Sequence, residues 1–203
     1  WGLRPELAEF VPSFANGGWQ FLPGGGASVR WTLRPEARWA DGVPITSADF
    51  LATQARFPFR NISRIEPTEN GVVLFYEQPR PDVLYDVFLL PSHLLQELSA
   101  EDSPEWIFRK MPALTGPFRL VRWSKGQELL LERVENFCLG PPSLERIRVL
   151  FFENKQELMS AVRQSKVHLV PQGDLTPQEA KALSAEVPSM RAEIADSTVV
   201  WHL

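Results

Sequence analysis

Residues 31–50, WTLRPEARWADGVPITSADF, hold a strand end, a turn and a helix start within twenty positions. Hydrophobic and polar side chains alternate over residues 29–33, as they do in a strand with one buried face. A reversal of the chain follows, because Asp41-Gly42 supplies the positive φ that a tight turn needs and Pro44 fixes φ just after it.

A helix is expected to begin at Ser47. The hydroxyl of Thr46 can accept from the free N–H groups of its first turn, and Asp49 adds negative charge at the positive end of the helix dipole. The helix should end before Pro58, because proline has no N–H and clashes with the preceding turn. The stretch therefore predicts strand, Asp-Gly turn and capped helix in that order.

This order of residues resembles the signature of the extracytoplasmic solute-binding proteins of family 5, which include oligopeptide-, dipeptide- and nickel-binding members. The match rests on Leu33-Arg34, Trp39, Asp41-Gly42, Pro44-Ile45-Thr46 and Ala48-Asp49-Phe50. Glu36 stands where the family usually has glycine. The passage after this helix is shorter than the family implies, which leaves the size of the ligand open.

A second block extends the resemblance over nearly all of the chain. Residues 114–120, LTGPFRL, resemble the family's Gly-Pro turn into a two-stranded ribbon, and residues 136–147 match a further family segment. Phe118 replaces the usual tyrosine, Cys138 replaces an aromatic residue, and His168 stands where family members commonly have aspartate.

The resemblance implies a fold that is α+β leaning to α/β and is periplasmic-binding-protein-like, of the class II type. One small sheet lobe would be joined to part of a larger mixed α/β lobe. We expect residues 1–18 to be a lead-in to the larger lobe, 19–112 to form the small α+β lobe, and 113–203 to be part of the larger lobe, with a third lobe absent.

Local patterns predict the remaining elements. Strands are expected at 19–21, 62–66, 72–77, 147–152, 167–170, 190–194 and 198–203, with an Asn70-Gly71 hairpin. Helices are expected in the first part of 83–95, from Pro91-Ser92, after Asn154 and after Thr176, and a surface loop or helical turn at 101–110.

Composition restricts the class of protein. The net charge of -4, with 21 basic and 25 acidic residues, argues against nucleic-acid binding by this region. No apolar run approaches the ~20 residues of a membrane span. The single cysteine excludes an internal disulfide, and Trp1 is not a natural start, so we expect a longer precursor.

No catalytic or metal-binding pattern stands out. The three histidines lie far apart and none forms H-x-x-x-H, so no metal site is expected. No nucleophile motif is present, and we expect neither an enzyme nor a cofactor. Cys138 has no basic residue within four positions, so it is expected to be buried packing without a lowered pKa.

Aromatic residues are the candidates for ligand binding, because solute pockets combine aromatic walls with a few polar anchors. The chain has seven Trp and thirteen Phe. We expect Trp31, Trp39, Phe50 and Trp123 to be core. The ligand-binding candidates, which lie where the resemblance brings this lobe to the ligand, are Arg56, Phe57, Phe59 and Tyr85.

The resemblance implies the substrate-binding component of an ABC transporter, periplasmic or at the cell surface, which captures a solute, with an oligopeptide favoured. Its partners would be a peptide or other small solute, an ABC permease and the missing lobe of its own parent chain, and the fragment is expected to self-associate. An alternative is the solute-sensing domain of a cytosolic transcription regulator with the same fold. A helix-turn-helix before Trp1 would indicate the regulator, and a signal peptide the transporter.

Overall fold

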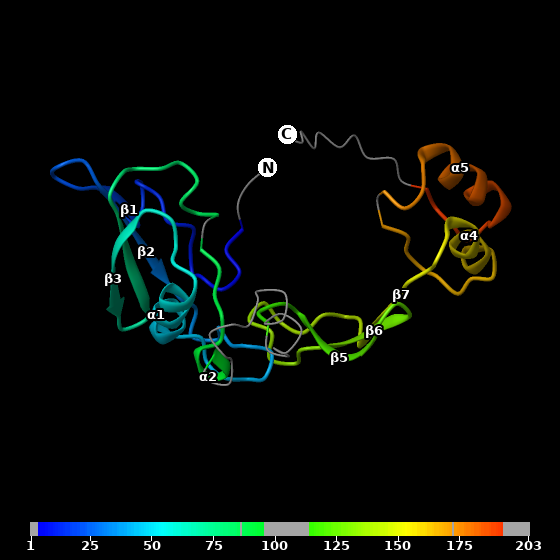
Figure 1. Ribbon diagram of the computed structural model, residues 1–203, viewed down its shortest axis with the longest axis horizontal. Coiled ribbons are helices and arrows are strands. Elements are labelled where there is room, and N and C mark those ends of the chain that lie inside the picture. The colour runs from blue at the N-terminus through cyan, green and yellow to red at the C-terminus, as the bar shows by residue number, and fades with distance from the viewer. Residues whose placement is uncertain (1–3, 86, 96–113, 172, 193–203) are drawn as a thin grey trace. The chain divides into compact units, whose positions relative to one another are not determined.

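The computed structural model describes residues 4–85, 87–95, 114–171 and 173–192 (Figure 1). Contacts divide the chain into two compact units. The first comprises Trp1–Trp123 with Leu129–Arg148, and the second Ser124–Glu128 with Val149–Leu203. Among the described residues, no helix is both long enough and apolar enough to cross a membrane.

The first unit contains a four-stranded antiparallel sheet (Figure 1). Its order is β1-β2-β4-β3, with β1 at Trp19–Phe21, β2 at Ala27–Thr32, β3 at Ile62–Thr68 and β4 at Gly71–Tyr76. Val29 pairs with Leu74, and both side chains are completely buried. The alternation predicted around Val29 therefore defines the core face of the sheet.

The β3–β4 hairpin was predicted correctly, but its loop lies one residue earlier than Asn70-Gly71. Thr68 pairs with Gly71, so the two loop residues are Glu69 and Asn70. Gly71 is already in β4, with φ of 149°, and a Cβ there would lie 2.0 Å from the carbonyl oxygen of Trp31. The glycine is needed for close approach of β2 rather than for the turn itself.

Helix α1, Ser47–Arg56, begins and ends as predicted. Thr46 and Asp49 form a capping box, in which the backbone N–H of Thr46 donates to Oδ2 of Asp49 over 2.8 Å. The turn before it contains Gly42 at φ of 91°. Phe50 is buried in the same cluster as Trp39 and the inner face of the sheet.

The chain after β4 only partly follows the prediction. Residues 81–85 form a turn instead of the short helix, with the N–H of Tyr85 donating to the carbonyl of Asp82 over 2.9 Å. This i to i+3 bond is not continued into a helix, and an extended passage follows. The helix expected from Pro91-Ser92 is present as α2, Ser92–Leu95.

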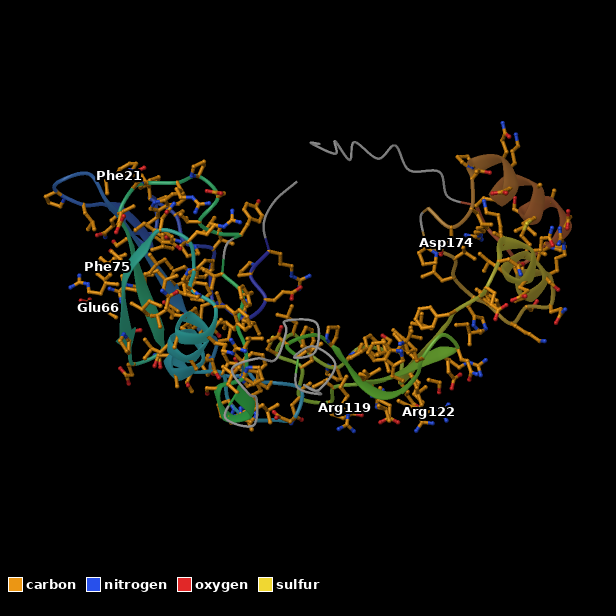
Figure 2. All side chains as sticks on the ribbon, in the orientation of Figure 1. Phe21, Glu66, Phe75, Arg119, Arg122 and Asp174 are labelled. Atoms are coloured by element: carbon orange, nitrogen blue, oxygen red, sulfur yellow. The ribbon has the colours of Figure 1, made fainter. Side chains whose placement is uncertain are left out.

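A second sheet has the order β5-β6-β7, with β5 at Phe118–Ser124, β6 at Glu128–Arg133 and β7 at Arg146–Leu150. The predicted two-stranded ribbon is thus confirmed. Arg119 and Arg122, labelled in Figure 2, are three positions apart on β5 and belong to opposite faces. Trp123, predicted to be core, lies on the face of Arg119 and is 43% exposed, so that prediction was wrong.

The second unit contains α4, Lys155–Arg163, and α5, Pro177–Glu186, capped as predicted by Asn154 and Thr176. The buried side chains of these helices are Ala161, Val162 and Leu183. Two ion pairs join the helices, Lys155–Glu179 at 3.1 Å and Arg163–Glu186 at 2.6 Å.

The strand predicted at 167–170 is absent. Within the described ranges no strand pairs with these residues, and Leu169 is 81% exposed, so neither ladder bonds nor burial would hold it extended. Residues 190–192 are not a strand either. The predictions for 101–110, 193–194 and 198–203 fall on residues outside the described part of the chain.

Candidate functional site

The first unit contains a cavity of about 710 Å³ with a mostly apolar wall. This volume lies within the range of about 300–1,000 Å³ that is usual for small-molecule sites. The wall is formed by residues 4–8, Val11, Trp31, Leu33, Trp39, Phe50, Leu84, 87–89, 114–116 and Phe118.

The most buried aromatic residues of the cavity wall come from the first signature block. Trp39 and Phe50 are 1% and 3% exposed, and Trp31 is half-buried. The N–H of Trp39 donates to the carbonyl of Val43 over 2.8 Å, which closes the turn that carries the indole ring. Trp39 and Phe50 were correctly predicted as core, but they also face the cavity.

Helix α1 holds the segment that follows the wall residues 87–89 by hydrogen bonds to the backbone of that segment. Oδ1 of Asp49 accepts from the N–H of Ser92 over 2.8 Å, and Oγ1 of Thr53 accepts from the N–H of Leu90 over 2.9 Å. The Thr53 hydroxyl itself donates to the carbonyl of Asp49 over 2.6 Å. Residues 90–92 are therefore fixed to the buried face of the helix.

Two of the four predicted ligand-binding residues, Phe57 and Phe59, lie against a ring that was not among the candidates, Phe88, and a third, Arg56, contacts Phe57. The Phe57 and Phe59 rings lie 6.3 and 5.9 Å from it, centroid to centroid, and the guanidinium of Arg56 lies 5.0 Å from the Phe57 centroid. Phe88 is also part of the cavity wall, whereas none of the four predicted residues is. Tyr85 is 71% exposed and is not among these contacts.

The charged groups among the residues that line the cavity belong to the segment before the first sheet. Arg4 and Glu6 form part of the wall, and the carbonyl of Glu6 accepts from Nε of Arg34 over 2.9 Å and from Sγ of Cys138 at 3.5 Å. Burial raises the pKa of the half-buried Cys138 thiol, and the nearby Arg34 charge lowers it by less. Cys138 is thus a protonated thiol at neutral pH, as a packing role requires.

Metal-ligating side chains do not cluster in the described residues. These residues contain no group of three or more His, Cys, Asp or Glu side chains placed to hold an ion. His93 instead contacts a carboxylate, with Nε2 lying 2.7 Å from Oδ2 of Asp41.

Comparison with known protein families identifies the class. Residues 9–201 match the model of the bacterial extracellular solute-binding proteins, family 5. The chain belongs to this family, as the two signature blocks predicted. Because the family is one of solute-binding proteins, the prediction of a binding module rather than an enzyme is confirmed at the level of the family.

Among curated relatives, the chain is 25% identical over 182 residues to an Escherichia coli K12 protein described as "Probable D,D-dipeptide-binding periplasmic protein DdpA". The match covers 79% of this chain and 35% of the relative. The chain therefore spans about a third of the length of that relative.

Two solved structures share the fold. An oligopeptide-binding protein from Thermus thermophilus, complexed with a pentapeptide, aligns over 91% of this chain and 39% of its own, with a TM-score of 0.72 and 21% identity. NikZ from Campylobacter jejuni, in complex with Ni(L-His), aligns over 82% of this chain and 34% of its own, with a TM-score of 0.64 and 23% identity. The predicted periplasmic-binding-protein-like fold is confirmed.

Proposed function

We propose that the protein containing this chain is the substrate-binding component of an ABC transporter, and that it captures an extracytoplasmic oligopeptide for import by a permease. Membership of the family over residues 9–201 is the observation that carries this proposal. The choice of a peptide rests on the pentapeptide complex of a structure with the same fold and on the mostly apolar cavity, which can accept side chains.

Binding would occur by closure of lobes over the solute, because contacts to both lobes stabilise the closed form. We propose residues 19–112 as the small lobe, 113–203 as part of the larger lobe and 1–18 as its lead-in, with the rest of the parent chain supplying the third lobe. Arg56, Phe57, Phe59 and Tyr85 remain our candidates for solute contacts on this part of the protein.

The regulator reading has weaker support. The family model describes extracellular proteins, and the Escherichia coli and Thermus thermophilus relatives are described as binding proteins. We therefore propose an extracytoplasmic location for the parent protein.

Calorimetry on the full-length parent protein tests the proposed function. The ligands are a set of tri- to pentapeptides, a single amino acid and the nickel–histidine complex. We expect peptides to bind with micromolar or tighter affinity and the other ligands to bind at least tenfold more weakly. Saturable binding of the nickel complex with no peptide binding would overturn the choice of solute, and a DNA-binding domain in the parent would overturn the transport role.

A further inference from the structure

Two polar side chains of α1 are buried and use their polar atoms on other parts of the first unit. Asp49 is 1% exposed and Thr53 is not exposed at all. Four positions separate them, so they lie on the same side of the helix. Burial of a carboxylate and a hydroxyl is costly unless each finds hydrogen-bond partners, so their partners indicate what the two residues do.

Their partners lie on one short backbone segment, about forty residues further along the chain. The segment is held at two alternate amides, Leu90 N–H by Thr53 and Ser92 N–H by Asp49. The other oxygen of Asp49 accepts from the N–H of Thr46, and the Thr53 proton is donated to the carbonyl of Asp49. Each of the three side-chain oxygens therefore has a hydrogen-bond partner within the protein.

The residues immediately before this anchored segment form one wall of the cavity. Val87, Phe88 and Leu89 all belong to the wall, and the Phe88 ring also contacts Phe57 and Phe59 just beyond the C-terminus of α1. Helix α1 and the residues just after it thus contact this part of the chain twice: Asp49 and Thr53 bind the backbone of residues 90–92, and the rings of Phe57 and Phe59 contact Phe88. Residues 90–92 directly follow this part of the wall, so a shift of the segment would move the Phe88 ring relative to Trp39 and Phe50, which also line the cavity.

The wall also indicates the chemistry of the occupant. It carries the rings of Trp31, Trp39, Phe50, Phe88 and Phe118, and apolar surface favours apolar occupants. An aromatic or branched aliphatic side chain suits the ring-lined part of the cavity, whereas the charged wall residues, Arg4 and Glu6, belong to the segment before the first sheet.

We propose that the cavity receives an aromatic or branched aliphatic side chain of the solute, and that Asp49 and Thr53 are positioning residues that set its selectivity by anchoring residues 90–92. The choice of a peptide side chain rests on the proposed function. The positioning role itself can be measured with a model compound.

The experiment compares Thr53→Val, which has nearly the same shape but neither hydrogen bond, with Thr53→Ser, which keeps the hydroxyl. The probe is N-acetylphenylalaninamide, titrated into the 203-residue chain and followed by NMR. N-acetylalaninamide, which has the same amide groups but no phenyl ring, is the control ligand. We expect the phenyl probe to bind the native chain and Thr53→Ser alike and to bind Thr53→Val at least fivefold more weakly. Ser63→Ala is the matched control, since Ser63 is exposed on β3 and its Oγ donates to the carbonyl of Phe75, and it should bind as the native chain does.

Equal phenyl-probe affinity in folded Thr53→Val and the native chain would overturn the positioning role, as would a fivefold loss in folded Thr53→Ser. If Thr53→Val does not fold, Phe88→Ala is tested in its place. The Phe88 side chain is 47% exposed, so we expect the chain to fold without it. The proposal requires Phe88→Ala to weaken the phenyl probe and is contradicted if it does not.

The same variants, made in the parent protein, separate this inference from the proposed function. The test uses two peptides that differ only in having Phe or Ala at one position. The ratio of their affinities should be at least fivefold smaller in Thr53→Val than in the native protein. In one outcome the parent protein binds no peptide while the phenyl-probe results are as expected. This outcome would contradict the choice of solute and would still support the positioning role.

Discussion

Gly71 is a residue at which backbone geometry tolerates no side chain. It combines φ of 149° with a position where a Cβ would lie 2.0 Å from the carbonyl oxygen of Trp31. We expect Gly71→Ala to reduce the free energy of unfolding by at least about 1–3 kcal/mol, the cost of a strained backbone conformation. Urea unfolding measures this loss. Gly116→Ala is the control, because the φ of Gly116 is not positive and, among the described residues, a Cβ there would meet only the carbonyl oxygen of Phe118, at 4.0 Å. Equal stability of the two variants would contradict the β2–β4 register.

Glu179 is the residue with the clearest pH dependence. Its pKa is lowered to about 2, mainly because its carboxylate accepts from the backbone N–H of Thr176, with further contributions from the Thr176 hydroxyl and Lys155. A carboxyl whose folded pKa lies below its unfolded value of 4.5 stabilises the fold above pH 4.5, and this stabilisation is lost as the pH falls through about 2.

We therefore expect the carboxyl of Glu179 to titrate near pH 2 in an NMR titration, and the melting temperature of the native chain to fall between pH 5 and pH 2. In Glu179→Gln the melting temperature should fall less over this range, because the carboxyl whose protonation destabilises the fold has been removed. A titration midpoint above pH 4, or identical pH profiles of the two proteins, would contradict the cap geometry.

Capping residues were predictable from sequence because their partners are local. Thr46, Asn154 and Thr176 each accept within three residues of themselves. The bond of Thr53 to Leu90 spans 37 positions, and that of Asp49 to Ser92 spans 43, so no local pattern reveals them. Phe88 was missed for the same reason, since its role follows from tertiary contacts with Phe57, Phe59 and the cavity wall.

At the scale of elements, α1 links the signature stretch to the cavity. We expect Thr46→Ala to lower the free energy of unfolding by about 0.5–2 kcal/mol, because the N-terminal N–H groups of the helix lose their capping oxygen. Thr46→Ser keeps the oxygen and should be close to the native stability. Chemical denaturation of the three proteins checks this. A loss in Thr46→Ser as large as in Thr46→Ala would show that the methyl group, rather than the cap, stabilises the helix.

Elements that depend on distant partners were predicted less well than capped helices. Residues 167–170 have a strand-forming composition but no neighbouring strand in the described residues. Whether such a segment becomes a strand depends on its hydrogen bonds to a neighbouring strand rather than on its own pattern. On β5, the pattern indicated that Trp123 is apolar but could not show which face of the sheet is covered. Strands β2 and β4 were predictable because their buried residues follow the hydrophobic pattern of the sequence. Helices α4 and α5 were predictable because their capping residues are adjacent in the sequence.

At the scale of the whole molecule, several large apolar side chains are exposed on this chain. Val121 and Trp123 share one face of β5 and are 48% and 43% exposed, and Leu144 is 62% exposed. Clustered apolar surface favours association. We expect the isolated chain to self-associate in light scattering at high concentration, and Val121→Lys to reduce the association. A strict monomer, or no effect of Val121→Lys, would contradict this expectation.

The proposed lobes belong to a protein longer than this chain. The boundary between residues 112 and 113 falls outside the described residues, and the chain spans about a third of the relative DdpA. The family and its fold follow from the chain itself, whereas the solute and the transport role concern a longer protein.

Hydrogen exchange of the parent protein, with and without a saturating peptide that contains phenylalanine, tests the central claim most directly. If the cavity receives a solute side chain, the amides of residues 87–89 should become protected when the peptide binds. They line the cavity and precede the segment that Asp49 and Thr53 already anchor. We expect slower exchange at these amides in the native protein and a smaller effect in Thr53→Val. Peptide-induced protection confined to residues outside 1–203 would contradict it.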